Sequence, residues 1–363
     1  FQAEHGIRDC LLSRGLGDVY KRQMRRLEES FAKRYGVKFA ISFVNGTSTM
    51  HAALEAYGIG VGDEVIVPPL TMAATTFCVL QCGATPVFAD VDEETFQICS
   101  KSIEANINSK TKAIITVGLF GLSPDMDPIM ELAARNDLNV IEDNAECFLG
   151  YYKDRLAGTI GHSASFSFQS SKHLTSGEGG MIITNDPKFA NRIRKIQSLG
   201  YAGVSATKGK ITKLDIQDPT YSRHEIMGWN YRMPELCCAV ALAQVENIDL
   251  LVLQRQKVAK IFEEASSKYT NWFKPQHVPS DCINSYWTWV CKLDTDKVGW
   301  HQFRDKFLEF GGDGIYAAWK LTYMEPMFQN LDLLGREKLI SKDDPSPIGL
   351  VAEMVGNIEA AFI

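Results

Sequence analysis

The stretch "SFSFQSSKHLTSGEGG", residues 165–180, places one lysine, Lys172, between a strand-like run and a glycine-rich turn. Serines and aromatic residues precede the lysine, and little else in the stretch is charged. A lysine amine is a nucleophile only when it is neutral, which requires partial burial or a neighbouring cation. Lone lysines are usually solvated, so a chemical role for Lys172 depends on the residues that the fold brings beside it.

Short runs rich in β-branched residues alternate with helical patterns along most of the chain. The seven runs span residues 38–43, 63–68, 85–91, 111–121, 138–144, 163–168 and 179–186. This alternation predicts an α/β fold with a mostly parallel seven-stranded sheet and helices on both faces. The runs are apolar enough for burial on both sides of the sheet.

The length of 363 residues suits one large domain and one smaller domain. We expect the large domain at residues 24–245 and a small C-terminal α+β domain, incomplete at its end, at residues 246–363. Residues 1–23 have no amphipathic period. They are either a non-native segment, such as translated adapter sequence, or a genuine N-terminal arm, and we exclude them from the fold.

Three patterns define the expected C-terminal part. A long helical pattern over residues 235–260 predicts the connector between the domains. Residues 286–293 predict a strand, with Trp287 and Trp289 on one face of it and directed into the core. Residues 299–312 predict a helix.

Composition excludes several classes of function. The net charge of −6 gives no reason to expect nucleic acid or a membrane surface as a partner. No apolar run reaches the roughly 18 residues that a membrane span needs. The nine cysteines are scattered and form no metal-binding pattern, which favours reduced thiols in a cytoplasmic protein and no metal site.

Polar residues follow two of the expected strands and lie near Lys172. Asp143 ends the run "VIED", and ligands of open α/β sheets bind at the carboxyl ends of strands. Such a carboxylate suits a protonated ring nitrogen, although it could instead cap the next helix. The residues "NGTS" (45–48) lie at a strand-to-helix turn where backbone N–H groups can face a phosphate, and Ser167 could reach the same phosphate. A phosphate site, an acid and an amine together describe a pyridoxal 5'-phosphate (PLP) site.

Ordered motifs carry a resemblance to a known family. They are "NGTSTMHAAL" (45–54), "GDEVIVPPLTMAAT" (62–75), "GATPVFADVD" (83–92), "VIEDNAE" (140–146), "GTIGHSASFSFQSSKHLTSGEGGMIITND" (158–186) and "GWNYRMPELCCAVALAQ" (228–244). In these motifs the chain resembles the DegT/StrS-type nucleotide-sugar aminotransferases, which are fold-type I PLP enzymes. The match extends from about residue 27 to about residue 329.

The resemblance implies a role for each matching position. Lys172 matches the lysine that binds the cofactor covalently, and Asp143 matches the acid on the pyridine nitrogen. The phosphate site would consist of Gly46, Thr47 and Ser167. Asn230, in "WNYRM", matches an asparagine that reaches the phosphate of the neighbouring subunit, which implies a homodimer with shared active sites.

Two positions depart from the family pattern. Met72 stands where an aromatic residue usually stacks on the cofactor ring, and methionine packs there less rigidly. Glu146 stands where glutamine usually lies near the phenolic oxygen of the cofactor, and a carboxylate beside a phenolate is repulsive unless one of them is protonated.

The sequence indicates the residues that would contact the substrate less clearly than those that would hold the cofactor. Tyr316 and Trp319 occupy the place of a substrate-facing loop in the family, although packing within the small domain explains them equally well. The basic run "TKGKITK" (207–213) could meet a nucleotide diphosphate or simply be a solvated loop.

The resemblance therefore implies an aminotransferase that moves an amino group, from glutamate, to a keto sugar carried on a nucleotide. Lipopolysaccharide or O-antigen biosynthesis is the expected setting. A PLP-dependent sugar dehydratase on the same fold and a catalytically silent regulatory or scaffold protein are the alternatives. The dehydratases of the family carry histidine in place of the lysine, so Lys172 favours amino transfer.

Overall fold

A computed structural model describes residues 22–208, 217–269, 271–313, 315–330 and 332–339 of the chain. It begins with a helix at Arg22, so the last two residues of the segment excluded above, 22 and 23, belong to a helix. The rest of that segment lies outside the described residues.

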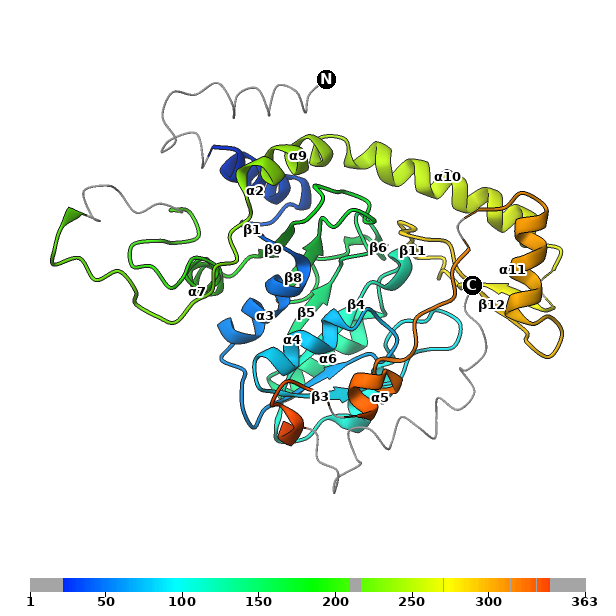
Figure 1. Cartoon of the computed structure of the whole chain (residues 1–363), viewed down its shortest axis with the longest axis horizontal. Coiled ribbons are helices and arrows are strands. Elements are labelled where there is room, and N and C mark those ends of the chain that lie inside the picture. The colour runs from blue at the N-terminus through cyan, green and yellow to red at the C-terminus, as the bar shows by residue number, and fades with distance from the viewer. Residues whose placement is uncertain (1–21, 209–216, 270, 314, 331, 340–363) are drawn as a thin grey trace.

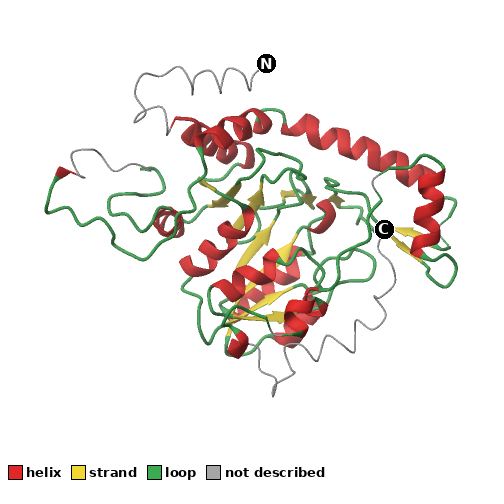
Figure 2. Ribbon diagram, in the orientation of Figure 1, coloured by secondary structure: helices red, strands yellow, loops and turns green. Residues whose placement is uncertain are grey.

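A seven-stranded sheet forms the centre of the molecule (Figures 1 and 2). Its strands are β1 (Phe39–Phe43), β2 (Glu64–Val67), β3 (Thr85–Phe88), β4 (Thr111–Val117), β5 (Asn139–Asp143), β8 (Ser163–Ser167) and β9 (Gly180–Thr184). Their order in the sheet is β1-β9-β8-β5-β4-β2-β3, and only β9 runs against the others. The seven runs expected from the sequence and the mostly parallel sheet are thereby confirmed.

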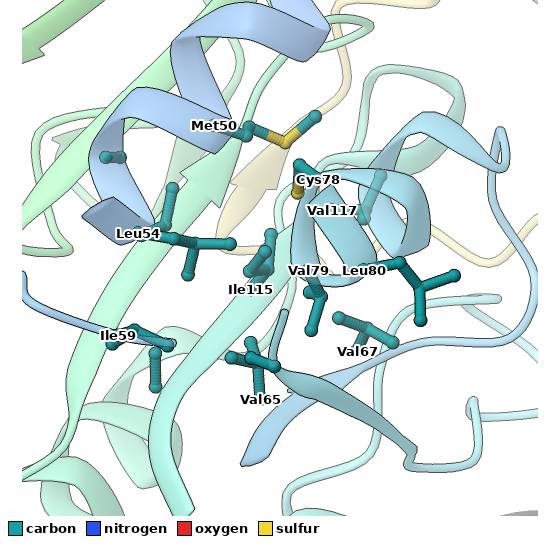
Figure 3. Close-up of a cluster of buried hydrophobic side chains, with 14 of the residues drawn as sticks. Met50, Leu54, Ile59, Val65, Val67, Cys78, Val79, Leu80, Ile115 and Val117 are labelled. Atoms are coloured by element: carbon teal, nitrogen blue, oxygen red, sulfur yellow. The ribbon is translucent and has the colours of Figure 1, made fainter. Parts of the chain in front are cut away.

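Helices cover both faces of the sheet, as the sequence predicts. One face carries α3 (Gly46–Ala56), α4 (Ala74–Gln81) and α7 (Pro187–Gln197), and the other carries α2 (Arg22–Tyr35), α5 (Ser100–Asn106), α6 (Met126–Asn136) and α9 (Glu235–Val245). Successive strand residues alternate between the two cores. Val65 and Val67 join Met50 and Leu54 of α3 (Figure 3), whereas Ile66 packs on the face that carries α6.

Asp143 faces the same side of the sheet as Val65. Alternate residues of a strand point to the same face, and Ile141, two residues before Asp143, packs in the same core as Val65. Its register partner in β8 is Ser165, whose hydroxyl contacts Thr49 of α3. The end of β5 therefore directs the Asp143 carboxylate toward the N-terminal ends of α3 and α4, where a ligand can reach it.

Shorter elements complete the described chain. They are η2 (Leu119–Gly121), β6 (Tyr151–Tyr152), β7 (Arg155–Leu156), α10 (Ile248–Ser266), β10 (Phe273–Pro275), β11 (Cys282–Ile283), β12 (Cys291–Leu293), α11 (Trp300–Glu309), η3 (Thr322–Met324), α12 (Pro326–Gln329) and η4 (Glu337–Leu339). β11 pairs with β6, which belongs to the expected large domain, and β10 pairs with β12. The domain boundary at residue 245 stays a prediction, and α9 ends at that residue.

Two expected elements of this region are wrong in detail. The pattern over 235–260 forms two helices, α9 and α10, bent by 63° at a short break. Asn247, in the break, donates from its side chain to the carbonyl of Ala243 and so competes with continued helix hydrogen bonding. Only the last three residues of the expected strand 286–293 form β12, because Trp287 donates its backbone N–H to Phe120 instead of to a neighbouring strand.

The helices also bear on membrane association. Within the described ranges, no single helix is both long and apolar enough to cross a membrane. The bent pair α9 and α10 meets that criterion only when its two helices are taken together, by length and composition.

Candidate active site

A cavity of about 1700 Å³ opens at the carboxyl ends of β4, β5 and β8. The loop after β8, the first turn of α3, helix α10 and residues 286–290 and 315–319 line it. Every residue that the sequence analysis assigned to the site lines this cavity except Asn230. Ligand sites in proteins usually measure about 300–1,000 Å³, so the space admits a large substrate beside a cofactor.

Lys172 lies in the loop that follows β8, and its amine is enclosed by two groups. Its Nζ is 3.0 Å from Oε1 of Glu146, and the side chains of the two residues are only 12% and 4% exposed. The ring of Trp287 covers the amine at 4.4 Å from the ring centroid. The indole N–H of Trp287 donates to the carbonyl of Ser171, which ties the ring to the lysine loop. Lys172 is thus a partly buried, oriented amine, as its proposed role requires.

The backbone of Phe120 holds both neighbours of this amine. Its N–H donates to Oε2 of Glu146 at 3.2 Å, and its carbonyl accepts the backbone N–H of Trp287 at 3.1 Å. Phe120 has a left-handed φ of 62°, which is uncommon for a bulky residue. A strained peptide in a buried loop beside reactive groups is typical of functional sites.

Asp143 ends β5 and is 5% exposed. Oδ2 accepts the hydroxyl of Thr75 at 3.0 Å, and Oδ1 accepts the backbone N–H of Ala145. Burial raises the pKa of the Asp143 carboxyl above its usual value, while these hydrogen bonds and the charge of Lys172 oppose the shift. The next helix along the chain, α7, begins at Pro187 and is capped by Asp186, so the alternative that Asp143 caps the next helix is wrong.

Glu146 is the second buried carboxyl at this end of the sheet. Burial raises the pKa of Glu146, and the neighbouring Lys172 amine opposes that shift. The structure places the carboxylate directly on the lysine. A contact with the phenolic oxygen of the cofactor stays a prediction.

The first turn of α3 forms the other side of the cavity. Asn45 caps this helix by accepting the backbone N–H of Ser48, and Gly46 and Thr47 line the cavity. A Cβ on Gly46 would lie 3.0 Å from Cβ of Ser167, so a larger residue would push the end of β8 away. The site therefore has a close backbone approach at the N-terminus of a helix, an arrangement that suits a phosphate.

Three other expected residues lie around the mouth of the cavity. Met72 is 54% exposed and Tyr316 is 77% exposed, so both side chains are accessible to a ligand. The Trp319 ring lies 6.0 Å from Trp287 and 6.2 Å from Phe120, which places it beside the lysine neighbourhood. Trp287 and Trp289, both expected in the core, line the cavity, and Trp287 also packs against the core.

Asn230 does not line the cavity. It is exposed, bridges Ser198 through the backbone, and accepts a hydrogen bond from Arg232. Its predicted role in the site of a second subunit stays untested. Residues 209–213 of the expected basic loop lie outside the described residues. Within the described part of the chain, no group of three or more His, Cys, Asp or Glu could hold a metal ion.

His173 follows the lysine and is turned into the protein. Its Nε2 lies 3.0 Å from the carbonyl of Ser285, so that nitrogen must carry the proton that it donates. Burial lowers the pKa of His173 to about 3. The ring is therefore neutral at pH 7 and anchors the lysine loop to residues 284–287.

Sequence reasoning missed Thr75, Phe120, Trp287 and Arg255, all of which touch or line the site. Thr75 lies inside the quoted motif 62–75, just after β2, and a parallel sheet brings the carboxyl end of β2 to the same edge as Asp143; that shared edge is a signal that could have identified Thr75. The others belong to segments with no local signature.

Comparison with known proteins gives a match over most of the chain. A sequence model of the DegT/DnrJ/EryC1/StrS aminotransferase family matches residues 8–336. GDP-perosamine synthase of Caulobacter vibrioides is 40% identical over 267 residues, which are 73% of this chain and 68% of that protein.

Solved structures share the fold. The aminotransferase from Psychrobacter cryohalolentis superposes with a TM-score of 0.82 at 29% identity, covering 98% of this chain and 97% of that one. The E. coli GDP-4-keto-6-deoxy-D-mannose-3-dehydratase with bound hydrated PLP has a TM-score of 0.78 at 23% identity, covering 92% and 86%. At that identity the second likeness establishes the fold alone.

Proposed function

Because the chain belongs to the DegT/DnrJ/EryC1/StrS aminotransferase family, we propose that it transfers an amino group from an amino acid to a nucleotide-linked keto sugar. Membership confirms the family that the motifs predicted, together with its cofactor, PLP. The observation that carries the proposal is the convergence of Lys172, Asp143 and the first turn of α3 on one cavity.

The residues of the cavity fit PLP. Lys172 would bind it covalently, Asp143 would pair with its ring nitrogen, and Gly46, Thr47 and Ser167 would hold its phosphate. The raised pKa of the buried Asp143 supports this fit, because a carboxylate away from water gains most from a cationic partner. Met72 lines the same cavity and would pack on the ring.

The bound cofactor supplies an electron-accepting ring that stabilises negative charge on the carbon bearing the amine. The protein contributes proton transfer and orientation. When Nζ of Lys172 is free, it can take a proton from the substrate carbon and return it elsewhere as a general base and acid. Glu146 and Trp287 restrict where Nζ points and leave the Lys172 side chain only 12% exposed.

The substrate class follows from the relatives. GDP-perosamine synthase takes its name from a nucleotide-linked amino sugar, so a GDP-linked keto sugar is the first substrate to test here. A cavity of about 1700 Å³ has room for a nucleotide-linked sugar beside PLP. Tyr316 and Trp319, at the mouth, would contact this substrate. We expect glutamate as the amino donor, as the sequence resemblance implies.

The active species is expected to be a homodimer in which Asn230 of each subunit completes the phosphate site of the other. The exposure of Asn230 outside its own cavity supports this arrangement. A location in the cytoplasm stays a prediction of the sequence.

The test is a screen of nucleotide-linked keto sugars with PLP and glutamate, read by mass spectrometry. The expected product carries nitrogen in place of the keto oxygen, with 2-oxoglutarate formed in equal amount. A product that has lost water and gained no nitrogen would identify a dehydratase. A folded protein that binds PLP in no condition would indicate a regulatory or scaffold member.

A further inference from the structure

Arg255 is a cation on the wall of the cavity with no assigned role. It lies on α10, whose cavity-facing side also presents Leu251, Val258 and Phe262. Among the described residues that line the cavity, Arg255 and Lys172 are the only arginine and lysine. Arg255 is partly buried, and burial lowers the pKa of its guanidinium.

The two cations differ in how their charge is balanced. Lys172 has Glu146 at 3.0 Å, whereas no ion pair links Arg255 to a carboxylate of the described chain. The hydrogen bond formed by Arg255 runs from Nη1 to the neutral backbone carbonyl of Trp287. A guanidinium has five N–H donors, so most remain for another partner. A partly buried charge without a counter-ion is costly, which leads us to expect an anion from a ligand.

Arg255 lies close to the reactive amine. The carbonyl of Trp287 accepts its hydrogen bond, and the ring of the same residue covers Nζ of Lys172 at 4.4 Å. Trp287 therefore contacts both cationic side chains, one through its carbonyl and the other through its ring. A substrate whose amine or carbonyl carbon is at Lys172 would bring a nearby oxyanion within reach of Arg255.

The cavity is lined by more acidic than basic side chains, so Arg255 matters for the binding of an anion. Its described lining includes four carboxyl side chains, from Asp143, Glu146, Glu178 and Asp313. Such a wall repels phosphates and carboxylates unless a cation offsets it locally. Both substrates of the proposed function are anions, so the cavity needs a group that overcomes this repulsion.

We propose that Arg255 binds the oxyanion of the substrate, either a phosphate of the nucleotide-linked sugar or a carboxylate of the amino donor. The proposal rests on the proposed function for the identity of these ligands. The planar guanidinium matches either group through two parallel hydrogen bonds, whereas a lysine would offer only a point charge. Arg255 is thus a specificity-determining residue of the site.

The experiment measures binding by calorimetry, so no turnover is needed. GDP serves as the diphosphate probe and glutarate as the carboxylate probe, each titrated into PLP-loaded protein at two salt concentrations. Arg255→Gln should weaken binding of at least one probe about tenfold or more, since hydrogen bonds to charged groups are strong. Arg255→Lys should restore it only in part. Lys257→Gln is the matched control, since Lys257 is exposed on the same helix and does not line the cavity, and it should change binding less than about twofold.

The outcomes separate the two anions. Loss of GDP binding alone assigns Arg255 to phosphate, loss of glutarate binding alone assigns it to carboxylate, and loss of both assigns it to each half of the reaction. Wild-type protein that binds neither probe, or a folded Arg255→Gln protein that binds both normally, would overturn the proposal. Arg255→Lys answers the same question if Arg255→Gln fails to fold. Arginine-dependent binding in a protein without aminotransferase activity would contradict the proposed function and leave this inference standing.

Discussion

The amine of Lys172 and the carboxylate of Glu146 lie 3.0 Å apart and are almost closed to water. Removing one partner of a buried ion pair leaves an uncompensated charge and typically costs about 3–5 kcal/mol, whereas removing both can be nearly neutral. In the cofactor-free protein, Glu146→Leu should therefore lower the free energy of unfolding by about 3 kcal/mol.

Urea unfolding of Glu146→Leu, Lys172→Met and the double variant measures this coupling. The double variant should recover most of the loss, and Glu146→Gln, which keeps an acceptor for the Phe120 N–H, should cost less than Glu146→Leu. If the losses of unfolding free energy in the two single variants simply add in the double variant, the ion pair contributes nothing to stability.

Trp287 should affect the rate more than the binding of substrate. Trp287→Leu removes both the ring above Nζ and the indole donor to Ser171, and Trp287→Phe removes only the donor. We expect kcat to fall about tenfold in Trp287→Leu and less in Trp287→Phe, with KM nearly unchanged, because a cation–π contact contributes roughly 1–2 kcal/mol when desolvated. Steady-state kinetics decide it, and a rise in KM at unchanged kcat would assign Trp287 to substrate binding instead.

His173 should make the folded protein sensitive to acid. The pKa of the buried ring is about 3, so between pH 6.5 and pH 3 the unfolded chain binds a proton that the folded protein does not. Stability due to this ring is thus full above pH 6.5 and decreases as the pH falls. From pH 7 to pH 5 the loss should be about 2 kcal/mol.

Urea unfolding at both pH values compares wild type with His173→Gln, which can still donate to Ser285. The other titrating groups are common to both proteins, so the wild type should lose more stability on acidification. If both proteins lose the same stability on acidification, protonation of His173 is not coupled to folding.

Asn230 should act in the site of the neighbouring subunit. In an isolated hybrid dimer of Asn230→Ala and Lys172→Ala subunits, a shared arrangement leaves one site with both residues intact. The hybrid should then have about half the wild-type activity, which exceeds that of either parent homodimer. Activity equal to half that of the Asn230→Ala homodimer would place Asn230 in its own site.

The strands and the motif residues could be predicted from the sequence because their signals are local. Residues 113–117, for example, are all buried and are apolar except for Thr116, as a sheet covered on both faces requires. Asp143 and Gly46 lie at strand ends, where the topology of an α/β sheet brings a ligand. These features need no knowledge of contacts between distant segments.

The walls of the site could not be predicted in the same way. Trp287 and Ser171 are 116 residues apart, and nothing in the sequence around Trp287 indicates that it leaves a strand to cover an amine. The bend between α9 and α10 was also missed, because an apolar helical pattern continues on both sides of it. Tertiary contacts decide both features.

Covalent attachment of PLP to Lys172 is the central claim, and borohydride reduction tests it most directly. Purified protein incubated with PLP should be yellow, lose that colour on reduction, and yield one peptide that carries the reduced cofactor on Lys172. Lys172→Ala should fold, as judged by circular dichroism, and give no such peptide. A reduced adduct on another lysine, or none in a folded wild-type sample, would contradict the account.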